Sequence, residues 1–145
     1  MYRKSLFVIF LVLVAGMQTA CKKNNPSEQT DINMLVDKVW TFSLSHPDGF
    51  TLDIRTMTEP TEGIAVSYAA TQGSHSREQL PEVITHALEH DGYVGGWYST
   101  SEDLYYFDST RLFPEDSLSA ALAFGKDNGQ YSVFILSTGT EMVIK

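Results

Sequence analysis

The chain is poor in cysteine and in positive charge. Cys21 is its only cysteine, and ten Lys and Arg stand against eighteen Asp and Glu in 145 residues. A single thiol excludes an internal disulfide framework, so the folded part must be held together by its core. The formal net charge of −8 excludes the clustered basic surface that nucleic-acid binding requires. The sequence therefore predicts an acidic, disulfide-free body that does not bind nucleic acid.

The chain also lacks an apolar run long enough to span a membrane. Its longest apolar stretch covers residues 6–17, which is 12 residues, whereas a spanning helix needs about 20. Arg3 and Lys4 precede the stretch, and small residues follow it. A charged start, a short apolar centre and a small-residue exit are typical of a secretory signal peptide. We predict this signal over residues 1–20.

The exit of this segment, Thr19-Ala20-Cys21, resembles the lipobox of bacterial lipoproteins. Gln18 departs from that pattern, which normally has an apolar residue at its position. The resemblance implies cleavage before Cys21, acylation of its thiol and anchoring in a bilayer of the bacterial cell envelope, with the outer membrane favoured. Cleavage further upstream is the alternative, and it would leave Cys21 as a free thiol.

Beyond the signal, two regions differ in composition. Residues 21–36 are interpreted as the lipidated cysteine and a flexible tether, because residues 24–30 are polar and show no apolar periodicity. Residues 37–145 have the length and apolar content of one domain with its own core.

Hydrophobic periodicity within 37–145 predicts an α+β fold. Alternation predicts strands near 40–45, 50–55, 64–69, 93–98, 104–113 and 131–136. Helical spacing predicts a helix that ends before Gly92 and another that begins near Asp116. The order predicts an antiparallel sheet with two helices on one face: a ferredoxin-like split β-α-β-β-α-β core preceded by a β-hairpin with its turn at 46–49. A curled sheet wrapping the longer helix is the alternative.

One short motif suggests metal chemistry. His86-Ala87-Leu88-Glu89-His90 resembles the H-x-x-E-H motif of inverted zinc peptidases, which implies two imidazole ligands and a carboxylate that polarises water. Helical geometry places His86 and His90 beside the apolar stripe and Glu89 on the opposite side. An ordinary polar helix surface explains this pattern, so we predict no cofactor and keep His86 and His90 as weak metal candidates.

Aromatic residues gather between residues 93 and 113. Rings on alternating strands must occupy both faces of a sheet, and an uncovered face with Tyr and Trp can bind proteins or sugars. Core and cross-strand packing is the competing interpretation. Asp103 and Asp108 in the same region do not have the spacing of a calcium-binding loop and are interpreted as residues of solvated turns.

These observations favour a lipid-anchored, non-enzymatic domain that binds a protein partner at the cell envelope. It would serve as the inhibitor of a secreted hydrolase or protease, or as an immunity protein. A small zinc-dependent hydrolase and a glycan- or ligand-binding lipoprotein are the alternatives. The residues proposed for partner binding lie in turns and in the aromatic region: His46, Pro47, Asp48, Trp97, Tyr98, Ser101 and Glu102.

Overall fold

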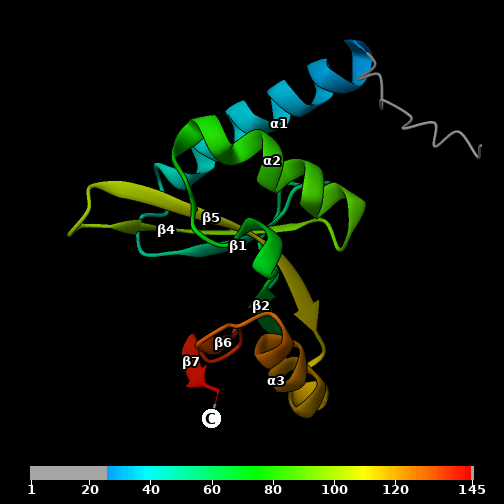
Figure 1. The fold of residues 1–145 in the computed structure, drawn as a ribbon, viewed down its shortest axis with the longest axis vertical. Helices are drawn as coiled ribbons and strands as arrows, with labels where there is room; N and C mark the ends of the chain where they lie inside the picture. The colour runs from blue at the N-terminus through cyan, green and yellow to red at the C-terminus, as the bar shows by residue number, and fades with distance from the viewer. Residues whose placement is uncertain (1–25, 145) are drawn as a thin grey trace, which may run out of the picture.

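The structure, a computed structural model, describes residues 26–144, with side chains from residue 31 onwards. This part of the chain forms a mixed α+β fold with a seven-stranded antiparallel sheet and three α-helices (Figure 1). None of these helices is both long and apolar enough to cross a bilayer. The helices are α1 (Pro26–Ser43), α2 (Ser76–Glu89) and α3 (Leu118–Asp127).

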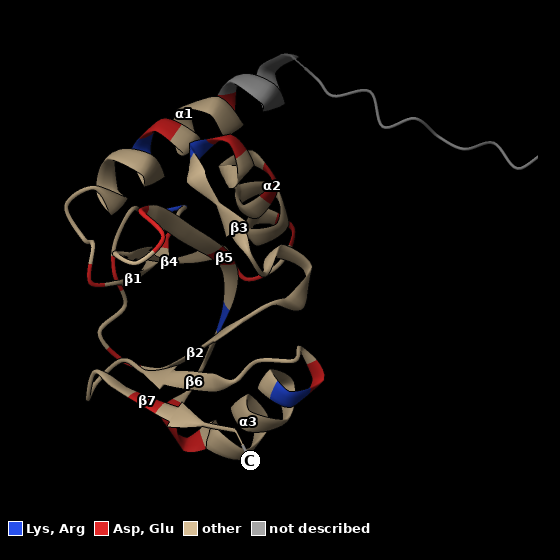
Figure 2. Ribbon diagram, turned by 60° about the vertical axis from the view of Figure 1, so that its left-hand side comes forward, with Lys and Arg blue, Asp and Glu red and all other residues tan. Residues whose placement is uncertain are grey.

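Six strands follow the order β1-β4-β5-β2-β6-β7 across the sheet, and β3 also pairs with β5. Their bounds are β1 (Phe50–Asp53), β2 (Ile64–Ser67), β3 (Ser74–His75), β4 (Tyr93–Ser99), β5 (Leu104–Phe113), β6 (Ser132–Ile135) and β7 (Thr140–Val143). The ten-residue β5 pairs with β4 along residues 104–110 and with β2 along residues 110–113. Figure 2 shows α1, α2, β1 and β4 in an upper part and α3, β6 and β7 in a lower part, connected by β5 and β2.

All three helices pack on the same face of the sheet. Phe107 of β5 lies in a buried cluster with α1 and α2, and Phe113 lies in a second cluster with α3. These residues are six apart, so they project from the same face of β5. The opposite face has no helix against it among the described residues. The two clusters therefore form a core on one side of the sheet and leave the other side open.

The prediction of a β-hairpin is wrong for the first of its two strands. Residues 40–43 belong to α1 and not to a strand. Val36, Val39 and Ser43 recur at helical spacing and are buried against the core, whereas Leu44 is 55% exposed. The alternation of Trp40, Phe42 and Leu44 imitates a strand, but burial of the helical stripe decides the conformation.

The second half of the predicted hairpin does form a strand. It is β1, which pairs with β4 at the edge of the sheet. The predicted tether over 21–36 is helical from Pro26 onwards, and its first five residues lie outside the described part of the chain.

Candidate functional site

The open face of the sheet is hollowed into a cleft with a volume of about 890 Å³. Its walls come from both parts of the molecule seen in Figure 2, with β1, β4 and β5 on one side and β2, β6 and β7 on the other. The side chains along its floor are small, which makes the surface concave. They include Thr51, Ala65, Ser67, Gly95 and Thr110.

Gly95 accommodates the Thr110 side chain on the cleft side of β4. A Cβ atom at this position would lie 2.9 Å from Oγ1 of Thr110, which is closer than side chains normally approach. The next residue, Gly96, faces the helices, and a Cβ there would meet the rings of Phe50 and Phe107 at 2.7 and 2.9 Å. The glycine pair therefore makes room on both faces of β4, for Thr110 on one side and for the aromatic core on the other.

Asp108 is the most unusual group in the cleft. It lies on β5 opposite Gly95, and its Oδ1 atom is buried without a hydrogen-bond partner. Burial raises the pKa of the Asp108 carboxyl from 3.8 to about 6, and a hydrogen bond with the Ser67 side chain opposes that rise only in part. A buried carboxylate that lacks both a counter-ion and a full set of donors is costly to the folded state.

The interpretation of Asp108 as part of a solvated turn is wrong, because the residue lies inside β5 and its Oδ1 atom is buried. The only local signal is an acidic residue in an aromatic strand, Tyr105-Tyr106-Phe107-Asp108, where β-propensity disfavours Asp.

The charge of the cleft is entirely negative. Besides Asp108, the lining contains the exposed carboxylates of Asp48, Glu59 and Glu141, and it contains no Lys or Arg. Negative groups around a concave surface focus the potential and attract cationic groups. The electrostatics of the cleft therefore favour a positively charged ligand.

Two exposed aromatic rings lie along the cleft. Trp97 of β4 is 47% exposed and Phe134 of β6 is 43% exposed, and both belong to the lining. The Trp97 indole stacks on Tyr106, with ring centroids 5.1 Å apart and planes inclined by 17°. A stacked ring on an uncovered sheet face is a rigid platform for a ligand.

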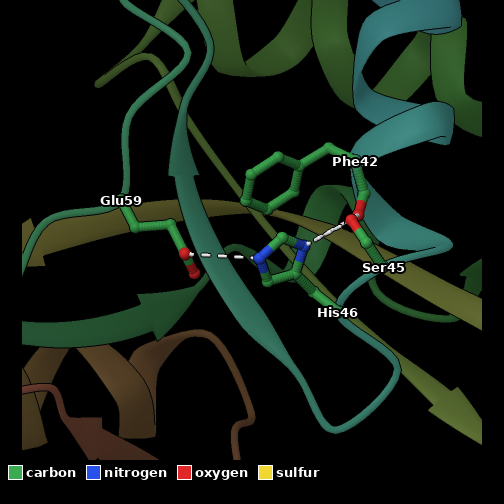
Figure 3. Close-up of polar contacts among 4 residues, drawn as sticks. All are labelled: Phe42, Ser45, His46 and Glu59. Carbon is green, nitrogen blue, oxygen red and sulfur yellow. Dashed lines mark hydrogen bonds and ion pairs between the residues drawn. The ribbon is translucent and has the colours of Figure 1, made fainter.

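The loop at 46–49 connects α1 to β1 and is not the turn of a hairpin. Figure 3 shows the His46 ring between Phe42 and Glu59. The ring stacks on Phe42, its Nδ1 lies 2.8 Å from the Phe42 carbonyl oxygen, and its Nε2 lies 3.7 Å from Oε2 of Glu59. The carbonyl of Pro47 accepts a hydrogen bond from the Tyr98 amide. These contacts hold the loop at the rim of the cleft.

The residues predicted for partner binding are thus divided by the fold. Asp48 and Trp97 both line the cleft, and His46 supports its rim through Glu59. The other four do not line it: Pro47 bonds β4 through its backbone, the Tyr98 ring packs on Tyr105 and donates to Asp103, and Ser101 and Glu102 lie in the β4–β5 turn.

The weak metal candidates are not arranged to hold an ion. The His86 and His90 rings stack in parallel, 3.9 Å apart with an 11° inclination. Lone pairs of parallel rings do not converge on one point. Nδ1 of His90 lies 2.7 Å from the His86 carbonyl oxygen. Among the described residues, no group of three His, Cys, Asp or Glu side chains is placed to bind a metal.

His86 instead belongs to a buried polar network. Its Nδ1 lies 2.6 Å from Oγ of Ser109, and the Ser109 amide donates to Oγ1 of Thr71 at 2.8 Å. Burial lowers the pKa of His86, the neighbouring His90 adds to this effect, and Glu89 opposes it. Ser109 is completely buried and has no route to a substrate. The pair has the composition of a nucleophile and a base, but its position makes it structural.

Comparisons of this chain with protein-family models, with curated proteins and with solved structures give no match. The cleft is therefore interpreted from its own residues. The predicted signal peptide and lipidation site at Cys21 lie outside the described residues.

Proposed function

We propose that this protein is a lipid-anchored, non-enzymatic domain of the bacterial cell envelope that binds a protein partner through the cleft. The observation that carries the proposal is the buried carboxyl of Asp108, which lies in an open, acidic concavity without a counter-ion. Groups that weaken a fold in this way concentrate at functional sites. The lipobox-like sequence at Cys21 supports the location.

A protein segment suits the dimensions and chemistry of this surface. The cleft is wide and runs across strands from both parts of the molecule. The Trp97 and Phe134 rings supply separate apolar anchors, and the floor between them offers hydroxyl groups. Interfaces of proteins combine a few aromatic anchors with surrounding polar contacts. Inhibition of a secreted hydrolase or protease and neutralisation of a toxin are the two roles that fit a small anchored binder.

Glycan binding is the second candidate. The stacked Trp97 and Tyr106 rings beside hydroxyl and carboxyl groups favour it, because sugars bind through ring stacking and hydrogen bonds. The charge of the ligand distinguishes the two candidate functions. A neutral sugar gains little from a lining that has carboxylates and no cations, whereas a basic protein segment gains much.

We also propose a specific topology for the central strands of the sheet. The central strands lie in the order β4-β5-β2-β6, with α2 between β2 and β4 in sequence and α3 between β5 and β6. This arrangement supports a ferredoxin-like split β-α-β core, extended by β1 at one edge and β7 at the other. In such a core the helices occupy one face, which leaves the other face for binding.

Site-specific crosslinking in cells tests the proposed function. A photo-reactive amino acid replaces Phe134, which lines the cleft, and in a matched control it replaces Leu88, which is 37% exposed on α2. We expect a discrete adduct with one protein from position 134 and none from position 88. A protein adduct from position 88 alone would place the partner on the helical face and contradict the proposal.

A further inference from the structure

The positions of the protein's own Lys and Arg residues indicate what kind of partner group the cleft can bind. Residues 31–144 contain five Lys and Arg, and none of the five lines the cleft. Lys38 and Lys126 belong to α1 and α3, on the far side of the sheet. Arg77 pairs with Asp37. Arg111 lies over two phenylalanine rings, and Arg55 donates to backbone carbonyls at the end of α2. No described Lys or Arg is therefore available to neutralise the carboxylates of the cleft.

Asp108 lines the cleft, and its cross-strand neighbour Gly95 has no side chain that could pair with it. Trp97 follows two residues later on β4 and faces the same side of the sheet. Trp97 is therefore a diagonal neighbour of Asp108, at a separation of about 7–8 Å between Cα atoms. A planar cation lying on the indole can reach the carboxyl from that position.

We propose that the cleft takes an arginine side chain from its protein partner, with the guanidinium stacked on Trp97 and bound to the carboxylate of Asp108. This inference rests on the proposed function and names the chemistry of its contact. Guanidinium groups stack on aromatic faces and donate two parallel hydrogen bonds to a carboxylate. The surrounding carboxylates of Asp48, Glu59 and Glu141 favour the approach of the positive charge.

An arginine contact accounts for the incompletely paired acid in the sheet of the free protein. Ser67 provides one hydrogen bond, and Oδ1 of Asp108 has no donor within the described residues. A bound guanidinium supplies the counter-charge that the described residues do not provide. A carboxylate whose only purpose was structural would be expected to have its partner within the fold.

A titration with a small probe tests this chemistry. The purified full-length chain, held in a mild detergent, is titrated with Nα-acetyl-arginine amide and, as the matched neutral probe, with Nα-acetyl-citrulline amide, and amide NMR shifts are followed. We expect saturable shifts around Gly95 and Ser67. Because the charge-assisted contact is lost in citrulline, the arginine probe should bind at least about tenfold more tightly.

Two variants test whether Asp108 and Trp97 form the contact with arginine. Asp108→Asn keeps the shape of the side chain and should weaken arginine binding by about tenfold or more, whereas Asp116→Asn, outside the cleft, should not. Trp97→Leu, which leaves the carboxyl in place, should also weaken it. Equal binding of the two probes, equal effects of Asp108→Asn and Asp116→Asn, or saturable binding of a neutral oligosaccharide in place of arginine would overturn the inference.

The crosslinking experiment separates this inference from the proposed function. If Asp108→Asn leaves the yield of the adduct at position 134 unchanged, the partner binds the cleft without an arginine contact, and only the inference fails. If arginine binds at Asp108 but no protein adduct forms at position 134, the proposed function fails and the chemistry of the cleft stands.

Discussion

Gly95 lies directly opposite Asp108 in the β4–β5 pair, so no side chain stands across the strand pair from this acid. Both residues line the cleft. The pairing leaves the acid without a cross-strand partner that could compensate its charge. Either residue alone would be unremarkable in an antiparallel sheet.

Asp108→Asn should stabilise the protein at neutral pH. The pKa of Asp108 is raised by burial to about 6 from 3.8, so the folded state favours the protonated form. The stability that this proton provides is fully present below pH 3.8 and is lost as the pH rises through 6. Urea unfolding at pH 7 should show the variant more stable by about 1–3 kcal/mol.

At pH 4 the same difference should shrink to near zero, because wild-type Asp108 is then protonated in the native protein. Asp116→Asn should show no such pH-dependent gain. A variant less stable than wild type at pH 7 would show that Asp108 supports the fold and is not held there at a cost.

Gly96→Ala should destabilise the protein by about 1–3 kcal/mol, because its methyl group would overlap the packed rings of Phe50 and Phe107. Gly125→Ala is the matched control. Its closest neighbour is Cδ1 of Ile144, the movable end of a side chain, and the exchange gains about 1 kcal/mol of helix propensity. Thermal or urea unfolding should rank Gly96→Ala well below Gly125→Ala, and the reverse order would contradict this packing.

Thr71→Val should weaken the buried network around His86. The change removes the acceptor of the Ser109 amide, which is buried, and should cost about 1–3 kcal/mol in unfolding free energy. Thr138→Val, at an exposed turn, should change stability by less than about 0.5 kcal/mol. Equal effects would mean that solvent replaces the lost bond.

Zinc should not bind the His86–His90 pair in the low micromolar range. Calorimetric titration of wild type and His86→Ala should give the same weak response. A saturable site near micromolar zinc that disappears in His86→Ala would show that the rings leave their stacked arrangement to bind metal.

Cys21→Ala should abolish incorporation of labelled palmitate in the producing bacterium and release the protein from the membrane fraction. The lipobox resemblance at residues 19–21 is the basis for this expectation. Retention of label in the variant would end the lipoprotein interpretation, although the chemistry of the cleft would be unaffected.

Apolar alternation and apolar runs predicted β1, β2, β4, β5 and β6. They did not predict β3, which has only two residues. Alternation failed at 40–43, where aromatic residues of α1 happen to alternate. Of their helical partners, Val36 lies at the end of the segment that was interpreted as tether, and Val39 lies only three residues beyond it. Local pattern could not decide between the two, since the choice depends on packing against α2 and β1.

The site was harder to predict than the fold. Trp97 was expected from the aromatic cluster, and its place on an open face agrees with one of the two interpretations given for those rings. The importance of Asp108 depends on Gly95 and Ser67, which lie on the two strands that pair with β5 and are distant from Asp108 in the sequence. Cross-strand register and burial of one oxygen atom are tertiary facts that a single sequence does not contain.

The most direct measurement is the titration of the Asp108 carboxyl carbon by NMR, in the free protein and with Nα-acetyl-arginine amide at saturation. We predict a pKa of about 6 for Asp108 in the free protein and a pKa lowered into the ordinary range of aspartate by the bound cation. An ordinary pKa in the free protein, or a raised pKa that arginine does not lower, would contradict this prediction.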